Sequence, residues 1–176
     1  MRKTILFDEE KILNRVEEVA DQINSEYGDT PIVAIPLLRG GIMFATDLIK
    51  KLKCPVEVDF LTTSSYGFSE TSSGNVNILT DLRTDIEGKD VLIIDDIIDT
   101  GKTLYKVREF LRTKNPNSIK ICTMLDKPSR READISVDFY GFEVDDLFIV
   151  GYGLDYQNFY RNVPYIFVFE KDDDNE

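Results

Sequence analysis

The sequence predicts an α/β fold with a central, mainly parallel sheet and helices on both faces. Strand and helix patterns alternate through the first two-thirds of the chain, which is typical of strands joined by crossover helices. Several strand candidates are continuous apolar runs, as buried strands require. With 176 residues, 42% of them hydrophobic, the chain can bury the core of one domain. We therefore expect a single domain over 1–176, with a disordered acidic tail at about 170–176.

The first predicted element is an amphipathic helix. Apolar residues recur at helical spacing behind Asp8, a predicted N-cap, and the pattern ends near Gly28. The run PIVAIPLL, residues 31–38, predicts a strand that stops at an Arg-Gly-Gly turn. A helix is expected next, from about 42 to 52.

The middle of the chain predicts further strands around a long loop. Residues 56–63, VEVDFLTT, alternate as a strand does and lead into 64–75, a stretch dominated by Ser, Thr, Gly and Asn. Long loops are often lids or binding loops, although flexible linkers share this composition, so both interpretations stay open. A short strand is expected at 77–80, a buried strand at 89–96 and a helix at 102–112.

The last third contains four more strand candidates and no linker or repeat. The apolar segments that predict these strands are 118–125, 136–142, 147–152 and 164–170.

Composition excludes several classes of protein. The net charge of -12 gives no basic surface for nucleic acid or anionic membranes, and no apolar stretch is long enough to span a bilayer, so we expect a cytoplasmic protein. Cys54 and Cys122 lie in or beside apolar runs and are expected in the core. The chain has no histidine, so proton transfer must use Asp, Glu, Lys, Tyr or Cys, and any metal is expected to be a hard cation on oxygen ligands.

The stretch VLIIDDIIDTGKTL, residues 91–104, concentrates the chemistry. Asp95 and Asp96 fall at the carboxyl end of a predicted strand, where open parallel sheets bind ligands. The turn 99–103 leads into a helix whose free N–H groups suit a phosphate. Adjacent carboxylates can hold Mg²⁺ or a sugar's hydroxyls, so the stretch predicts a ribose-phosphate site, with a solvated, capped loop as the alternative. A P-loop is disfavoured because its first glycine would be Asp96.

This stretch resembles the phosphoribosyl-diphosphate motif of type I phosphoribosyltransferases, and the hypoxanthine-guanine branch most closely. Three other segments share the resemblance: LLRGG at 37–41, SSYG at 64–67 and FIVGYGLDYQNFYRN at 148–162. The likeness extends from roughly Ile5 to Phe169. It implies the same parallel sheet, with a small hood of strands and loop contributed by the C-terminal part, and a cis peptide before Arg39.

The resemblance also implies roles for individual residues. Phosphoribosyl diphosphate would be bound by Arg39, Gly40, Asp95, Asp96, Thr100, Gly101, Lys102 and Thr103. The purine would be bound by Lys127, Phe148, Ile149 and Asp155. Asp95, Asp96 and Asp155 would hold Mg²⁺, Arg161 would support the diphosphate, and Ser65 and Tyr66 would begin a flexible loop that closes over the reaction. Taken without the resemblance, Lys127 and Asp155 would be solvated side chains and Phe148 a core aromatic.

The implied reaction transfers the 5-phosphoribosyl group from 5-phospho-α-D-ribosyl 1-diphosphate to N9 of hypoxanthine or guanine, with Asp99 moving a proton near N7. The main alternative is the same fold acting on xanthine or a pyrimidine. Another is an RNA-binding regulator, as in pyrimidine operon attenuators, but the acidic balance counts against it. Small-molecule substrates and a homo-oligomer, dimer or tetramer, are the expected partners.

Overall fold

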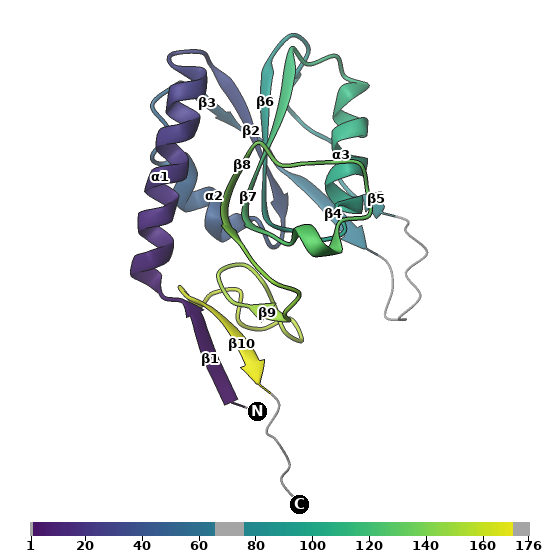
Figure 1. The fold of residues 1–176 in the computed structure, drawn as a ribbon. Helices are drawn as coiled ribbons and strands as arrows, with labels where there is room; N and C mark the ends of the chain where they lie inside the picture. Colours follow the sequence, from purple (N-terminus) through teal and green to yellow (C-terminus); the bar gives the residue numbers. More distant parts are fainter. Residues whose placement is uncertain (1, 66–75, 171–176) are drawn as a thin grey trace, which may run out of the picture.

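The computed structural model describes residues 2–65 and 76–170 and contains a seven-stranded, mainly parallel sheet (Figure 1). Its strand order is β5-β4-β2-β6-β7-β8, with β3 also paired to β2. Only the β4–β5 pair among these is antiparallel. The predicted parallel sheet is therefore confirmed. The strands are β2 (Ile32–Leu38), β3 (Val56–Val58), β4 (Leu61–Ser65), β5 (Val76–Ile78), β6 (Asp90–Ile98), β7 (Ser118–Asp126) and β8 (Phe139–Glu143).

Helices cover both faces of this sheet, as the sequence predicts (Figure 1). The helices are α1 (Glu9–Tyr27), α2 (Ile42–Ile49) and α3 (Lys102–Arg112). Successive side chains of β6 point to opposite faces, so Leu92 and Ile94 pack with α1 and α2, while Val91 and Ile93 pack with α3. This two-sided burial explains why β6 is a continuous apolar run.

The ends of α1 follow the sequence signals. The Asp8 carboxylate accepts the backbone N–H of Lys11 at 2.8 Å, and the Gly28 N–H donates to Asn24 O at 2.9 Å with Gly28 at φ 56°. The second helix is shorter than predicted: α2 ends at Ile49, because the next residues tighten into a turn in which Lys51 N–H bonds Leu48 O at 3.0 Å.

The strand predicted at 56–63 is two strands, because Asp59 interrupts it. The Asp59 carboxylate accepts backbone N–H groups from Phe60 at 2.8 Å, Arg83 at 2.7 Å and Thr84 at 2.8 Å. Burial opposes ionisation of Asp59, but these three N–H groups outweigh it and lower its pKa. The side chain thus fixes the bend between β3 and β4, which pair with successive parts of β2.

Smaller boundary differences occur elsewhere. The strand predicted at 89–96 continues to Ile98, and the one predicted at 77–80 spans Val76–Ile78. The strands predicted at 136–142 and 147–152 become β8 and the two-residue β9 (Ile149–Val150). Cys54 and Cys122 are both buried, as expected. None of the helices in the described residues is long and apolar enough to cross a membrane.

A second, three-stranded antiparallel sheet lies beyond the carboxyl ends of the central strands (Figure 1). It has the order β1-β10-β9, with β1 at Arg2–Phe7 and β10 at Ile166–Glu170. We call β1 together with residues 144–170 the hood. The predicted C-terminal strands are confirmed, but the sequence did not predict β1, which has no fully buried residue and depends on pairing with the other end of the chain. The predicted acidic tail lies largely outside the described residues, and the single-domain assignment stays a prediction.

Candidate active site

A cavity of about 290 Å³ opens at the carboxyl ends of β2 and β6. Its walls come from the end of β2 and the turn after it, Thr63 of β4, the end of β6, the turn into α3 and one residue of the hood. Most residues assigned to phosphoribosyl diphosphate by resemblance line it. These residues are Arg39, Gly40, Asp95, Asp96, Thr100, Gly101 and Thr103, joined by Asp99 and Arg161.

Asp95 and Asp96 form the acidic floor of this cavity. The Asp96 N–H donates to Asp95 Oδ1 at 2.9 Å, and the Ile97 N–H donates to Asp96 Oδ1 at 2.8 Å. Burial, followed by the charge of Asp96, raises the pKa of Asp95 well above its usual range, and burial also raises the pKa of Asp96. When carboxyl groups are costly to ionise by themselves, a bound cation strongly stabilises their ionised form.

The donor set at this floor fits a magnesium ion that a substrate helps to hold. Among the described residues, no three His, Cys, Asp or Glu side chains form a cluster that could bind a metal. Mg²⁺ is commonly bound by one or two carboxylates together with waters and substrate phosphates, so the Asp95–Asp96 pair suits it. The role assigned to Asp155 at the same ion stays a prediction.

The turn from β6 into α3 presents backbone N–H groups to the cavity. Gly101 has φ +82°, and a Cβ there would lie 2.6 Å from Ile135 Cγ2, so this position requires glycine. The N-cap residue Gly101 has no side chain to cap α3, and the Lys102 N–H makes only a long contact, 3.4 Å, with Thr100 Oγ1. The start of α3 and the positive end of its dipole therefore suit an anion. Thr100 and Thr103 add hydroxyl groups to the same wall. This geometry agrees with the predicted phosphate site.

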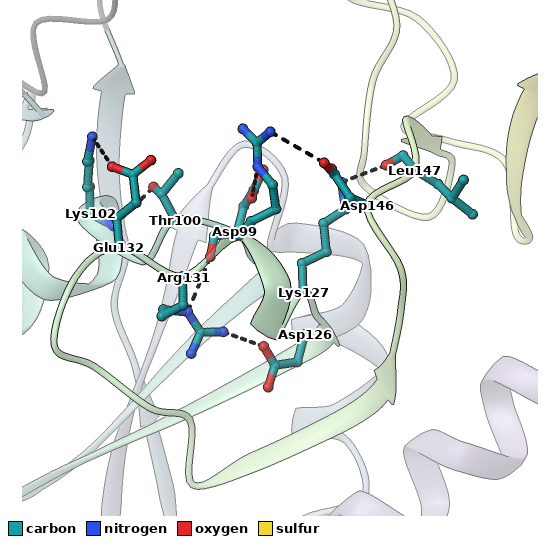
Figure 2. A network of polar contacts seen from close by, with 10 residues as sticks. Asp99, Thr100, Lys102, Asp126, Lys127, Arg131, Glu132, Asp146 and Leu147 are labelled. Carbon is teal, nitrogen blue, oxygen red and sulfur yellow. Dashed lines mark hydrogen bonds and ion pairs between the residues drawn. The ribbon is translucent and has the colours of Figure 1, made fainter.

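Lys102 differs from its neighbours in this turn. Its Nζ pairs with the Glu132 carboxylate (Figure 2), and the two groups are 2.7 Å apart. Lys102 is not among the residues that line the cavity. The Lys102 ammonium group is therefore directed at Glu132 and not at the cavity.

The Arg-Gly-Gly turn after β2 packs closely against the two aspartates. The Leu38–Arg39 peptide bond is cis, as the resemblance implied. A Cβ at Gly40 would collide with the Asp96 carboxylate, and one at Gly41 would lie 2.8 Å from Leu37 O. Two glycines are thus needed for the backbone to approach this part of the site.

Asp99 is held in a polar network that sequence reasoning missed (Figure 2). Arg130 Nε donates to Asp99 Oδ1 at 3.2 Å, and its Nη1 reaches Asp146 Oδ2 at 3.5 Å. Arg131 donates from Nε to Asp99 O at 3.2 Å and from Nη2 to the Asp126 carboxylate. The signal available in the sequence was the Ser-Arg-Arg segment, which follows shortly after a strand and close to Lys127, a predicted purine residue. These arginines hold the turn that carries Asp99.

Lys127 is buried, with 7% of its surface exposed, so the solvated alternative is wrong for this residue. Its N–H donates to Ile98 O at 2.9 Å, which ties the ends of β7 and β6 together. Its Nζ donates to Leu147 O at 2.6 Å and lies 3.7 Å from Asp146 Oδ1 (Figure 2). Lys127 thus reaches from the central sheet into the hood.

Phe148, next to Leu147, forms an exposed aromatic surface together with Tyr156. Phe148 is 61% exposed, so it is not the core aromatic that sequence alone would favour, and Tyr156 contacts its ring edge-on with 5.8 Å between centroids. Ile149 is buried in β9. A planar ligand could therefore stack on Phe148 beside the Lys127 ammonium group.

Asp155 and Arg161 form an ion pair at 2.9 Å. Arg161 also donates to Gly153 O, and Asp155 Oδ2 accepts the Asn158 N–H at 2.9 Å. Gly153 packs on Gly40, and a Cβ at position 153 would collide with the Gly40 carbonyl oxygen. Arg161 is the hood residue that lines the cavity. Of the predicted flexible loop, Ser65 ends β4, and Tyr66 lies outside the described residues.

Sequence comparisons match this chain along most of its length. A phosphoribosyl transferase domain matches residues 3–157. The chain is 52% identical to the hypoxanthine-guanine phosphoribosyltransferase of Bacillus subtilis over 166 residues, which cover 94% of this chain and 92% of that enzyme. It is 50% identical to the hypoxanthine phosphoribosyltransferase of Salmonella typhimurium, with 92% of each chain covered.

The fold is similar to solved structures as well. The crystal structure of a hypoxanthine phosphoribosyltransferase from Staphylococcus aureus superposes with a TM-score of 0.90 at 44% identity, and the match covers 95% of this chain and 91% of the other. A hypoxanthine-guanine phosphoribosyltransferase from Bacillus anthracis gives a TM-score of 0.90 at 40% identity over 95% of this chain and 98% of the other. The likeness thus includes the central sheet and the hood together.

Proposed function

Because the chain belongs to the phosphoribosyl transferase family, as its motifs predict, we propose that it transfers the 5-phosphoribosyl group of 5-phospho-α-D-ribosyl 1-diphosphate to N9 of hypoxanthine or guanine. The products are the nucleoside monophosphate and diphosphate, and the biological role is purine salvage. The main support is the cavity that joins Asp95 and Asp96 to a helix N-terminus on one side and to the hood on the other.

The phosphoribosyl group would be bound mainly by backbone and carboxylate groups. The N–H groups of 101–103 and the hydroxyls of Thr100 and Thr103 would hold the 5′-phosphate at the start of α3. Asp95 and Asp96 would orient the ribose hydroxyls and hold a Mg²⁺ ion that neutralises the leaving diphosphate. Arg39 and the Gly40 backbone would contact the diphosphate, with Arg161 behind them.

The base would bind where the hood meets β7. The Lys127 ammonium group, already directed at Leu147 O, would donate to the exocyclic oxygen of a 6-oxopurine. Phe148 would stack on the ring, and the backbone around Ile149 would read its edge. Asp99 would accept a proton from the five-membered ring near N7 as the N9–C1′ bond forms and the C1′–O bond to diphosphate breaks.

Xanthine or a pyrimidine remains the alternative substrate, and Lys127 with Phe148 favours a 6-oxopurine over a pyrimidine. An RNA-binding role is disfavoured by the net charge of -12. The expected cytoplasmic location and homo-oligomeric assembly stay predictions.

The decisive experiment measures nucleotide formation from phosphoribosyl diphosphate with hypoxanthine, guanine, xanthine or uracil supplied separately. We expect turnover with hypoxanthine or guanine that EDTA removes and excess Mg²⁺ restores. If uracil is the only one of the four bases that is converted, the substrate is a pyrimidine and not a 6-oxopurine. Folded protein that binds phosphoribosyl diphosphate but forms no nucleotide with any base would overturn the enzyme assignment, and a gel shift with its own leader RNA would then test the regulator alternative.

A further inference from the structure

Thr123 carries a buried hydroxyl group whose presence the fold alone does not explain. The residue is fully buried, and its Oγ1 has no hydrogen-bond partner among the described residues. A hydroxyl buried without a partner costs stability, because it loses its hydrogen bonds to water and gains none in return. Valine has nearly the same shape and would fill this position without that cost.

The strand register places Thr123 beside Asp95. The two residues are partners in the parallel pairing of β6 with β7. Two residues earlier on each strand, the partners Ile93 and Ile121 both belong to the apolar cluster under α3. Because side chains alternate along a strand, Thr123 and Asp95 also point to the α3 side of the sheet. Adjacent strands are about 4.8 Å apart, so these side chains are direct neighbours.

The Asp95 carboxylate can accept a further hydrogen bond. Its Oδ1 takes the Asp96 N–H, whereas a carboxylate has about four acceptor sites in total. On the other flank, β2 presents apolar side chains to this face, Val33, Ile35 and Leu37. Thr123 is thus the hydroxyl that the sheet places beneath Asp95, just under the floor of the cavity.

We propose that Thr123 is a positioning residue that donates its hydroxyl hydrogen bond to the Asp95 carboxylate when phosphoribosyl diphosphate is bound. The hydroxyl holds the carboxylate in the rotamer that meets the ribose and the cation, and it touches neither of them. This inference rests on the proposed function of the same cavity. The inference adds to the site a residue of β7 that supports Asp95 at the end of β6.

The test distinguishes the role of the Thr123 hydroxyl group from the packing of the side chain. Removing the hydroxyl should raise stability but weaken substrate binding. Thr123→Val removes the unpaired hydroxyl and should raise Tm by about 2–4 °C. It should also weaken binding of phosphoribosyl diphosphate with Mg²⁺, measured by calorimetry, by about 10- to 100-fold, as expected for a lost hydrogen bond to a charged group. The KM for hypoxanthine should be unchanged, because the base binds on the hood side.

Two control variants complete the design. Thr123→Ser keeps the hydroxyl and loses a buried methyl group, so Tm should fall by about 2–4 °C while binding is retained. Tyr27→Phe removes another buried hydroxyl, at the end of α1, that has no partner in the described part of the chain, and it should leave binding unchanged. If Thr123→Val fails to fold, comparing Thr123→Ala with Thr123→Ser isolates the same hydroxyl.

Three results would overturn the inference: wild-type affinity in Thr123→Val, equal losses in Thr123→Val and Thr123→Ser, or an equal loss in Tyr27→Phe. The outcome is distinct from that of the proposed function. Wild-type protein that forms no nucleotide with any base defeats the proposed function, whereas the calorimetric comparison of the variants still decides the role of Thr123.

Discussion

The two sides of the cavity are built in different ways. The phosphate side, residues 95–103, comes from one strand, one turn and the first residues of one helix. The hood side is assembled from distant segments, by the Lys127–Leu147 hydrogen bond, the contact of Gly153 with Gly40 and the hydrogen bond from Tyr152 Oη to Asp47 at 2.6 Å. The phosphate side is therefore a local structure, while the hood depends on tertiary contacts.

Backbone conformations show the same difference. In the hood, four non-glycine residues have positive φ: Tyr152, Gln157, Asn158 and Tyr160. Each such residue costs roughly 1 kcal/mol and persists only where its surroundings hold it. On the phosphate side, the one residue with positive φ is Gly101, for which this conformation carries no such cost. We expect changes on the phosphate side to affect chemistry directly and changes in the hood to act through geometry.

The largest effect is expected on the phosphate side, from Asp99→Asn. Losing the proton acceptor should lower kcat by about 10²–10⁴-fold with little change in KM for phosphoribosyl diphosphate. Steady-state kinetics with hypoxanthine provide the measurement. Wild-type turnover in this variant would show that Asp99 does not transfer the proton. The phosphate side would then contribute only substrate binding.

The next effect concerns the contact between the two sides. Lys127→Met keeps the length and the apolar stem of the side chain but cannot donate to a 6-oxygen. We expect KM for hypoxanthine to rise about 10- to 100-fold, since a hydrogen bond from a charged donor is lost. Affinity for phosphoribosyl diphosphate alone, measured by calorimetry, should stay near wild type. An equal loss for both substrates would show that Lys127 supports the whole cavity.

Gly153→Ala tests whether the hood acts through its packing on the Arg-Gly-Gly turn. Positive φ and the collision with Gly40 O should cost about 1–3 kcal/mol, which lowers Tm by roughly 2–4 °C per kcal/mol and weakens phosphoribosyl diphosphate binding. The matched control is Gly88→Ala: Gly88 also has positive φ, but no atom of residues 2–65 or 76–170 lies within 4 Å of the added Cβ. If both variants bind equally well, the Gly153–Gly40 contact does not shape the site.

The smallest effect on catalysis is expected from Asp59→Asn, which weakens the central sheet away from the cavity. Removing the carboxylate should lower the free energy of unfolding at pH 7 by about 1–3 kcal/mol with kcat unchanged. The folded-state pKa of Asp59 is below its unfolded value, so its contribution is fully present above the unfolded pKa and is lost as the pH falls through the folded pKa. Urea unfolding of both proteins from pH 7 to pH 3 should show their difference shrinking toward acid. A constant difference would contradict this role.

The sequence by itself determined the elements whose signals are local. The apolar run of β6, the Asp8 cap of α1 and the turn at Gly101 depend on neighbours a few residues away, so pattern and propensity were sufficient. The phosphoribosyl-diphosphate motif belongs to this class, since its carboxylates and its helix N-terminus are contiguous. Sheet type followed as well, because strands joined by crossover helices must run parallel.

Tertiary structure alone decided the features that need two distant segments. Strand β1 exists because β10 pairs with it, and the bend at Asp59 exists because Arg83 and Thr84 donate to its carboxylate. Lys127 looked like a surface lysine in the sequence, but the fold buries it and pairs its ammonium group with Leu147 O. The network of Arg130 and Arg131 around Asp99 has the same origin. The physical reason is common to all of these: the energy that fixes each residue comes from contacts that form only when the chain has folded.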